Sequence, residues 1–345
     1  MLHLTLKPIH RMKKYSILLL SILFVLLGLA SYFLITKKNT KSSVDSSDRN
    51  FAVSNVDEIT KVFIAKRGTE PNLLEKKSDG WYVNNKYKAG KNQIDNLINT
   101  IKNIRMASIP PKAAYTSIMK EMATIGTKVE IYTGGDVPAK TYYIGGVTND
   151  ERAVYFLMDK SVQPYIVELP QSVSNLTFRY ELSEEDWRDK TIFSVYDEDL
   201  STIHIDYPYE PNQSIHFQKK NKQWFAFDGQ EAPITNFDQK ILLRLVNSLQ
   251  EMKCEAFENG NVLKSKIEQM TPYSTFSYAN IHNQKYWVKI FPINPDIESK
   301  IDISPEFVHS EKLFRFYLLR QDGDLLLAQV QQMPTLLSKK SDFMK

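Results

Sequence analysis

DEITKVFI (Asp57–Ile64) and EDLSTIHI (Glu198–Ile205) decide the fold of this chain, because each segment opens a copy of the same pattern. Both are followed by the tripeptide EPN, at Glu70–Asn72 and at Glu210–Asn212. A Lys-Lys pair and a tryptophan then follow at the same mutual spacing in the two halves. Apolar residues alternate with polar ones within each segment, which predicts β-strands. The sequence therefore predicts two tandem copies of one structural unit.

Each copy predicts a strand, a turn, a second strand, a three-residue turn and a third strand. In the first copy this last turn is Ser78-Asp79-Gly80, which supplies glycine where a hairpin needs a positive φ. Apolar residues then recur at helical spacing over 94–104 and over 242–252, which predicts one amphipathic helix in each copy. Trp81 and Trp224 open the outgoing hairpin strands, and we expect both to pack in the core against the helix that follows.

A strand-rich tail follows each helix. The predicted tail strands are 140–146, 153–159 and 165–169 in the first copy, and 285–292, 314–320 and 324–330 in the second. Gly145-Gly146 is interpreted as part of a hairpin or loop. Strands, helix and strands occur in this order without regular βαβ alternation, which predicts an α+β fold with antiparallel sheets. We expect residues 51–190 to form the first repeat and residues 191–345 the second.

An uncharged apolar run, Tyr15–Ile35, lies between basic residues at 11–14 and at 37–38. As a helix it would extend ~30 Å, which matches the hydrocarbon thickness of a bilayer. It therefore predicts a transmembrane helix, preceded by a cytoplasmic tail (1–14) and followed by a polar, flexible tether (36–50). The alternative is a cleaved signal peptide with Gly28-Leu29-Ala30 as its cleavage site, but the length of the run favours a retained anchor.

The orientation follows from the position of this single span near the N-terminus. Long soluble domains are translocated largely regardless of loop charge, so we expect the short tail inside and the bulk of the chain outside. The expected location is the inner (cytoplasmic) membrane, with residues 15–35 in contact with the lipid bilayer and the two repeats extracytoplasmic.

The composition is that of a globular protein, with 42% apolar and 24% charged residues. The net charge of +4 is spread over interspersed basic and acidic residues, which argues against nucleic acid as a partner. The single cysteine, Cys254, cannot form an intrachain disulfide, and we expect a small buried apolar residue rather than a nucleophile.

Several landmarks occur in a fixed order along the chain. The basic tail, the span, the tether, a hairpin tryptophan and a helix precede the strands YYIGG, AVYFL and YIVEL and then the segment LSEEDWRDKTIFSV. In this order the chain resembles the DUF4340 family of membrane-anchored bacterial envelope proteins, over Phe51–Ile205. Trp187–Lys190 is similar to the family's Arg-Asp-Lys/Arg step, whereas the chain departs most from the pattern after Glu210. The resemblance implies no established activity or catalytic residues. It implies an accessory role at a membrane complex, because some relatives are encoded beside ABC-type transport systems.

The sequence lacks the common signatures of catalysis and cofactor binding. It contains no GxxxxGK[ST] phosphate loop, no GxSxG nucleophile elbow and no HExxH zinc motif. His204 and Asp206 share one face of a predicted strand, a geometry that suits a metal pair or an orienting hydrogen bond. The simpler interpretation is the solvent face of that strand, and the histidines are far apart in sequence. No catalytic, cofactor-binding or metal-binding residue is therefore predicted, and no cofactor.

Two acidic clusters flank the junction between the repeats. They comprise residues 184–186 with Asp189, and residues 197–199. Such dense carboxylates could hold Ca²⁺, but the alternating ligand order of an EF-hand is missing. We interpret them as a solvated junction, with Arg188 and Lys190 paired to these acids.

Three hypotheses of function follow. The first is a non-enzymatic, membrane-tethered protein whose repeats bind a partner in a cell-envelope complex, at sheet edges or in a cleft. The second is an envelope hydrolase or glycan-acting enzyme that uses scattered carboxylates, for example Asp206 or Glu210 with Asp228. The third is a small-ligand binding domain with three tryptophans lining its pocket. These tryptophans are Trp81, Trp224 and Trp287.

Overall fold

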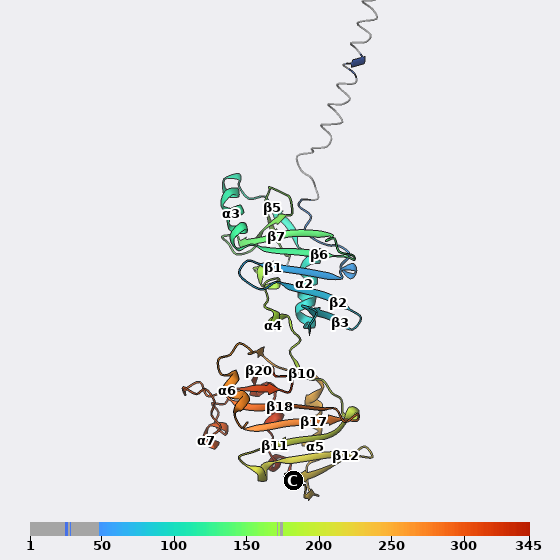
Figure 1. Ribbon diagram of the computed structural model, residues 1–345, viewed down its shortest axis with the longest axis vertical. Coiled ribbons are helices and arrows are strands. Elements are labelled where there is room, and N and C mark those ends of the chain that lie inside the picture. Colours follow the sequence, from blue (N-terminus) through green and yellow to red (C-terminus); the bar gives the residue numbers. More distant parts are fainter. Residues whose placement is uncertain (1–24, 27, 29–47, 171, 173–174) are drawn as a thin grey trace, which may run out of the picture. The chain divides into compact units, whose positions relative to one another are not determined.

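The computed structural model describes residues 25, 26, 28, 48–170, 172 and 175–345 (Figure 1). The predicted tail 1–14, most of the predicted span 15–35 and most of the tether 36–50 lie outside these residues. Among the described residues, no helix combines the length and the apolar character that a membrane crossing requires. By their contacts the described residues divide into two compact units: those up to Pro71 with those of Leu97–Glu181, and Asn72–Asn96 with Leu182–Lys345.

The fold is α+β and is dominated by two large antiparallel sheets, as the sequence predicts. The first nine-stranded sheet has the order β4 (Tyr87–Lys88), β3 (Gly80–Val83), β2 (Asn72–Lys77), β1 (Lys61–Lys66), β6 (Thr127–Tyr132), β7 (Lys140–Val147), β8 (Val154–Met158), β9 (Tyr165–Glu168) and β5 (Arg105–Ser108). The second has the order β14 (Pro233–Ile234), β13 (Gln223–Asp228), β12 (Ile215–Lys220), β11 (Leu200–Asp206), β17 (Ser274–Asn280), β18 (Lys285–Pro292), β19 (Arg315–Arg320), β20 (Leu325–Gln329) and β16 (Ala256–Phe257).

The strand order of the first sheet recurs in the second. In both sheets the first strand of the copy lies beside the strand that follows the helices. A short strand between the two helices, β5 in the first sheet and β16 in the second, closes the far edge. Figure 1 shows β12, β11, β17 and β18 side by side in the second sheet. Two halves of the chain with related sequence patterns therefore have sheets of the same topology.

A small sheet and short helices complete the structure. The small sheet pairs β10 (Thr191–Phe193) with β15 (Met252–Lys253). The α-helices are α2 (Lys91–Asn103), α3 (Tyr115–Ile125), α4 (Glu184–Trp187), α5 (Gln239–Ser248), α6 (Lys264–Gln269) and α7 (Pro305–Val308). The predicted helices 94–104 and 242–252 correspond to α2 and α5, although α5 ends at Ser248 and continues as a 3₁₀ turn.

The hairpin turns are tighter than the sequence suggests. Lys77 pairs with Gly80 and Lys220 pairs with Gln223, so each turn has two residues rather than the three predicted. In the second turn, Asn221-Lys222, both residues have positive φ, 49° and 65°. Such two-residue turns are favoured because their twist matches that of the strands they connect.

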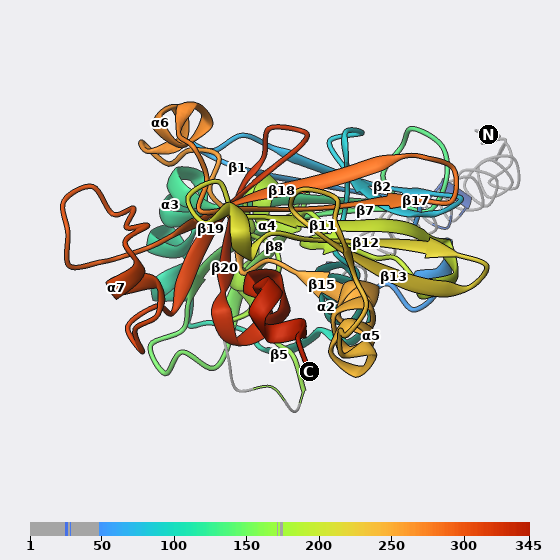
Figure 2. The ribbon, with the colours of Figure 1, turned by 90° about the horizontal axis from the view of Figure 1, so that it is seen from below.

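The second sheet buries one face against α5 and the C-terminal turns. Leu242, Leu245 and Val246 of α5 belong to the same buried cluster as Trp224 and the apolar residues of β11 and β12. Figure 2 shows α5 and the C-terminal segment to one side of these strands. Trp224 therefore packs in the core as predicted, whereas Trp81 is only half-buried.

Gly145-Gly146 lies within strand β7, which confirms the predicted strand 140–146, whereas the interpretation of the two glycines as part of a hairpin or loop is wrong. A Cβ atom on Gly145 would lie 2.8 Å from Met122 Cγ, and one on Gly146 would lie 2.1 Å from Glu121 Oε1. Both contact residues belong to α3, which packs on β7. Gly145 lets this helix approach the strand closely, because a Cβ there would meet a buried side chain, whereas at Gly146 only the exposed end of Glu121 would have to move.

Candidate functional site

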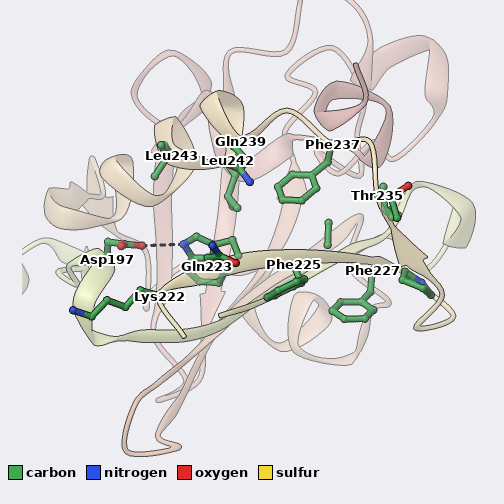
Figure 3. Close-up of a pocket in the computed structure, with 14 residues that line it drawn as sticks. Asp197, Lys222, Gln223, Phe225, Phe227, Thr235, Phe237, Gln239, Leu242 and Leu243 are labelled. Atoms are coloured by element: carbon green, nitrogen blue, oxygen red, sulfur yellow. Dashed lines mark hydrogen bonds between the residues drawn. The ribbon is translucent and has the colours of Figure 1, made fainter. Parts of the chain in front are cut away.

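A groove of about 610 Å³, lined by both apolar and polar side chains, lies at the edge of the second sheet, between β13 and α5 (Figure 3). We call it the β13–α5 groove. Its apolar lining consists of Trp224, Phe225, Ala226, Phe227, Pro233, Ile234, Phe237, Leu242 and Leu243. Its polar and charged lining consists of Asp197, Lys222, Gln223, Thr235 and Gln239. A concave site of this size that combines aromatic side chains with polar groups is a candidate binding site.

The groove exists because the edge strand β14 is very short. β14 pairs with β13 only through Ala226↔Ile234 and Phe227↔Pro233. Pro233 has no N–H to donate, which confines it to an edge position. The chain then turns away from β13 and pairs with the C-terminal segment, where the Asp238 N–H donates to the Phe343 carbonyl at 2.7 Å. The first half of β13 is therefore left without β14 beside it.

The backbone of β13 presents hydrogen-bonding groups to this groove. The Asp228 N–H donates to the Ala232 carbonyl on the outer side, at 2.9 Å. Strand residues two apart direct their amides to the same side, so Ala226 and Trp224 also direct theirs outward. Because β14 ends at Ile234, no described strand lies opposite Trp224 on that side. The groove thus contains an open stretch of sheet edge.

Side chains on both faces of β13 border this open edge. Phe225 and Phe227 lie on the face of the strand away from α5, whereas Leu242 and Phe237 approach from the α5 side (Figure 3). Phe225 is 44% exposed and Leu243 is 46% exposed. The run WFAF at 224–227 is the sequence signal that could have indicated this groove. A strand that is apolar on both faces is typically covered on both faces, so such a run predicts a partner for the face that the core does not cover.

Asp197 closes one end of the groove. Its Oδ1 accepts a hydrogen bond from Trp224 Nε1 at 3.0 Å (Figure 3). Its Oδ2 accepts one from Lys219 Nζ at 2.6 Å. Asp197 is half-exposed, and Glu198 and Asp199 are exposed, so the cluster faces solvent although the carboxylate of Asp197 makes these two contacts. Asp197 is a structural group, because it fixes the orientation of the indole that forms the base of the groove.

The predicted pairing of Arg188 and Lys190 with the junction acids is wrong. Arg188 is buried and its Nη1 donates to Asp324 Oδ1 at 3.3 Å. Its guanidinium also lies 3.7 Å from the ring centre of Tyr87 and 3.9 Å from that of Phe257. Lys190 donates to a backbone carbonyl, that of Glu255. The Trp-Arg-Asp-Lys element is therefore a structural anchor rather than a solvated junction.

The three acids of the hydrolase hypothesis are held by different partners. Asp206 Oδ1 lies 2.8 Å from His216 Nε2, and both carboxylate oxygens of Glu210 lie 2.8 Å from Lys339 Nζ. Asp228 accepts backbone hydrogen bonds from Ala232 and Gln230, which lower its pKa. A carboxyl that stays ionised is unsuited to act as a general acid.

The histidines are closer together than their sequence separation suggests. β11 and β12 pair with His204 directly opposite His216, and their ring centres lie 4.1 Å apart. Hydrogen bonds to Asp206 and to Glu231 raise the pKa of His216, although burial opposes this. Burial lowers the pKa of His204, and the neighbouring His216 adds to this effect. The sequence analysis did not identify His216 and Glu231 as neighbours of His204 and Asp206. The one signal that could have done so is the register of the hairpin, which places His216 opposite His204.

The tryptophans of the ligand-binding hypothesis are divided between sites. Trp224 lines the β13–α5 groove, whereas Trp287 lines a separate hollow of about 350 Å³ that also includes His204. Cys254 is buried as predicted, and burial raises the pKa of its thiol to about 11. A thiol with so high a pKa is not an activated nucleophile.

Comparisons with known proteins support the resemblance seen in the sequence. A family model described as a domain of unknown function, DUF4340, matches residues 81–273, which is more than half of the chain. The searches of curated proteins and of solved structures each found no match.

Proposed function

The chain belongs to the DUF4340 family, and we propose that it is a non-enzymatic, membrane-tethered envelope protein that binds an extended segment of a partner protein. The observation that carries this proposal is the open edge of β13 in an aromatic groove. In this interpretation the two halves of the chain are tandem copies of one unit. The second copy holds the binding site.

An extended segment is the ligand that the β13–α5 groove suits best. A peptide strand beside Trp224 would continue the line of β14 and use the outward backbone groups of β13. Its alternate side chains would contact Leu243 and Phe237 on one side and Phe225 and Phe227 on the other. Backbone pairing would supply affinity, and these two apolar surfaces would supply selectivity.

The location that we propose rests on the N-terminal sequence. The uncharged run Tyr15–Ile35 is long enough to cross a bilayer, and residues 36–50 would separate the repeats from the membrane by a reach on the order of 20 Å. A protein held at this height is suited to contact a membrane-embedded complex. An ABC-type transport system is the class of complex that the family resemblance implies.

The enzymatic alternative has less support in the contacts of the described residues. Asp206, Glu210 and Asp228 are engaged by different cationic or backbone partners. A glycosidase needs two carboxyl groups facing one substrate, with the pKa of one of them raised. The separate partners of these acids therefore favour a structural role for each.

A site-specific photocrosslinker tests the proposed binding site. We would place p-benzoylphenylalanine at Phe225, in the groove, and at Phe314, a control outside the groove that is more exposed, at 64% against 44%. The proposal predicts a discrete adduct from position 225 in native membranes and none of the same mass from position 314. Peptide mapping of the adduct should locate an extended segment of an envelope protein.

A second variant makes the crosslinking test specific. Leu243→Asp places a charge on the α5 wall of the groove and should abolish the adduct from position 225. Identical adducts from both positions, or an adduct that survives Leu243→Asp, would refute peptide binding in the groove. The location is tested separately with alkaline phosphatase fused to the C-terminus, which is active only after export. An inactive phosphatase fusion, together with an active C-terminal fusion to a reporter that works only in the cytosol, would refute the proposed orientation.

A further inference from the structure

A cluster of metal-ligating side chains lies on the solvent face of the second sheet, away from the β13–α5 groove lining. Ile203 and Ile205 of β11 are fully buried, so the alternating residues His204 and Asp206 lie on the opposite face. The β11–β12 register places His216 directly opposite His204. One ligand atom from each of these three residues lies within 4.8 Å of the others.

The donor set selects a class of cation. Two imidazoles and one carboxylate are typical ligands of Zn²⁺ and of neighbouring divalent transition metals. Ca²⁺ and Mg²⁺ prefer sites made of oxygen atoms alone. Three protein ligands also leave one position of a tetrahedral ion for water or for a group of a partner.

Glu231 contacts the second ring nitrogen of His216 and could therefore orient this histidine toward an ion. Its Oε1 lies 2.7 Å from His216 Nδ1, while Asp206 Oδ1 lies 2.8 Å from the other ring nitrogen, Nε2. Metal-bound histidines almost always donate their second ring N–H to a carboxylate or carbonyl, which fixes the orientation of the ring. Glu231 is positioned by the β13–β14 turn, where it has a φ of 63°. The turn therefore holds a carboxylate where an outer-shell partner of His216 is needed.

Asp206 and His216 need only a small adjustment to share one ion, and the ligand atom of His204 lies within 4.8 Å of theirs. Ligand atoms on a tetrahedral zinc ion lie about 3.4 Å apart, because the metal–ligand distances are ~2.0–2.2 Å. Asp206 would therefore move by about 0.6 Å from its present 2.8 Å contact with His216 Nε2. The Asp206 side chain is 44% exposed, so a rotation of this size meets little steric resistance.

From this geometry we propose that His204, Asp206 and His216 bind one divalent transition-metal ion of the Zn²⁺ class, with Glu231 orienting His216. The ion would cross-link β11 and β12 on the surface opposite the core. Because β12 pairs with β13, bound metal would also stiffen the strand that borders the groove. The site does not depend on the proposed peptide binding, and either proposal can fail without the other.

Titration of the full-length chain with ZnCl₂ tests the site. The protein is purified in detergent without a polyhistidine tag, stripped with chelator, and carries His3→Ala and His10→Ala so that tail imidazoles do not contribute. Isothermal titration calorimetry gives stoichiometry and affinity. Co²⁺ substitution gives an absorption spectrum that reports tetrahedral coordination independently of zinc affinity.

The variants are chosen so that a lost signal identifies the site. We expect one equivalent of Zn²⁺ in the unsubstituted site, at least a tenfold loss of affinity in His204→Ala and in Asp206→Asn, and a 10–100-fold loss in Glu231→Gln. His282→Ala removes an exposed histidine elsewhere in the same repeat and should change nothing. No uptake by the unsubstituted site, or an equal loss in His282→Ala, would overturn the assignment. If His216→Ala fails to fold by circular dichroism, the other variants decide the outcome.

Discussion

The ion pair between Arg188 and Asp324 gives the sharpest prediction about stability. The Arg188 side chain is 6% exposed and that of Asp324 is 13% exposed, so both charges are largely removed from water. Asp324 also lies 2.7 Å from Arg320 Nη2 and accepts a hydrogen bond from Asn259 at 2.9 Å. The two residues therefore depend on this ion pair to different degrees. Asp324 has two other donors, whereas Asp324 is the one acidic partner of Arg188 among the described residues.

This asymmetry sets the expected magnitudes. Asp324→Ala leaves a buried guanidinium without its counterion, which typically destabilises a protein by ~3–5 kcal/mol. Arg188→Met keeps an aliphatic chain between the rings of Tyr87 and Phe257 and leaves Asp324 with its other donors. The expected loss is then about 1.5–3 kcal/mol, the usual contribution of hydrogen bonds to a charged group.

Urea unfolding followed by circular dichroism measures these differences. The double variant Arg188→Met/Asp324→Ala should be more stable than Asp324→Ala alone, because it removes the unpaired charge. Arg315→Ala is the matched control, since it breaks an ion pair with Glu255 in which the arginine side chain is 51% exposed. That control should cost ~0–1 kcal/mol. Equal losses from Asp324→Ala and Arg188→Met, or strictly additive losses in the double variant, would refute the reasoning.

Three further predictions concern single residues. Gly145→Ala should destabilise the chain by about 1–3 kcal/mol in thermal unfolding, because its Cβ would meet the buried Met122 side chain at 2.8 Å. Gly146→Ala should change stability by less than about 0.5 kcal/mol, because only the mobile end of a glutamate must move; similar losses in both variants would contradict this. Cys254, with a pKa raised by burial to about 11, should react with a maleimide at pH 8 only after unfolding, and stoichiometric labelling of the native chain would contradict this. A hydrogen bond from the Ser304 hydroxyl lowers the pKa of Asp302 below its usual value of 3.8. The ionised carboxylate of Asp302 therefore stabilises the folded state above pH 3.8, and this stabilisation is lost as the pH falls through the lowered pKa. Asp302→Asn should therefore flatten the decline of the melting temperature below pH about 3.8, and an unchanged decline would count against it.

The local sequence determined the elements of this protein and their repetition. Alternating apolar residues located β1 and β11, and a helical period located α2 and α5. These signals are short-range, because side-chain direction follows from a period of two or of 3.6 residues. The two glycines of β7 were interpreted as a hairpin or loop because the reason for their small size is not local. They lie against α3, a separate element that packs on this strand.

Only the tertiary structure decided which distant residues meet. Arg188 and Asp324 are separated by 136 positions, and neither residue type identifies its partner. His204 and His216 face each other because of the β11–β12 register, which a shift of one residue would destroy. The β13–α5 groove likewise depends on where β14 ends and the C-terminal segment begins to pair. Sequence periodicity fixes which face of an element a residue occupies, but the pairing of strands across the sheet fixes its neighbours.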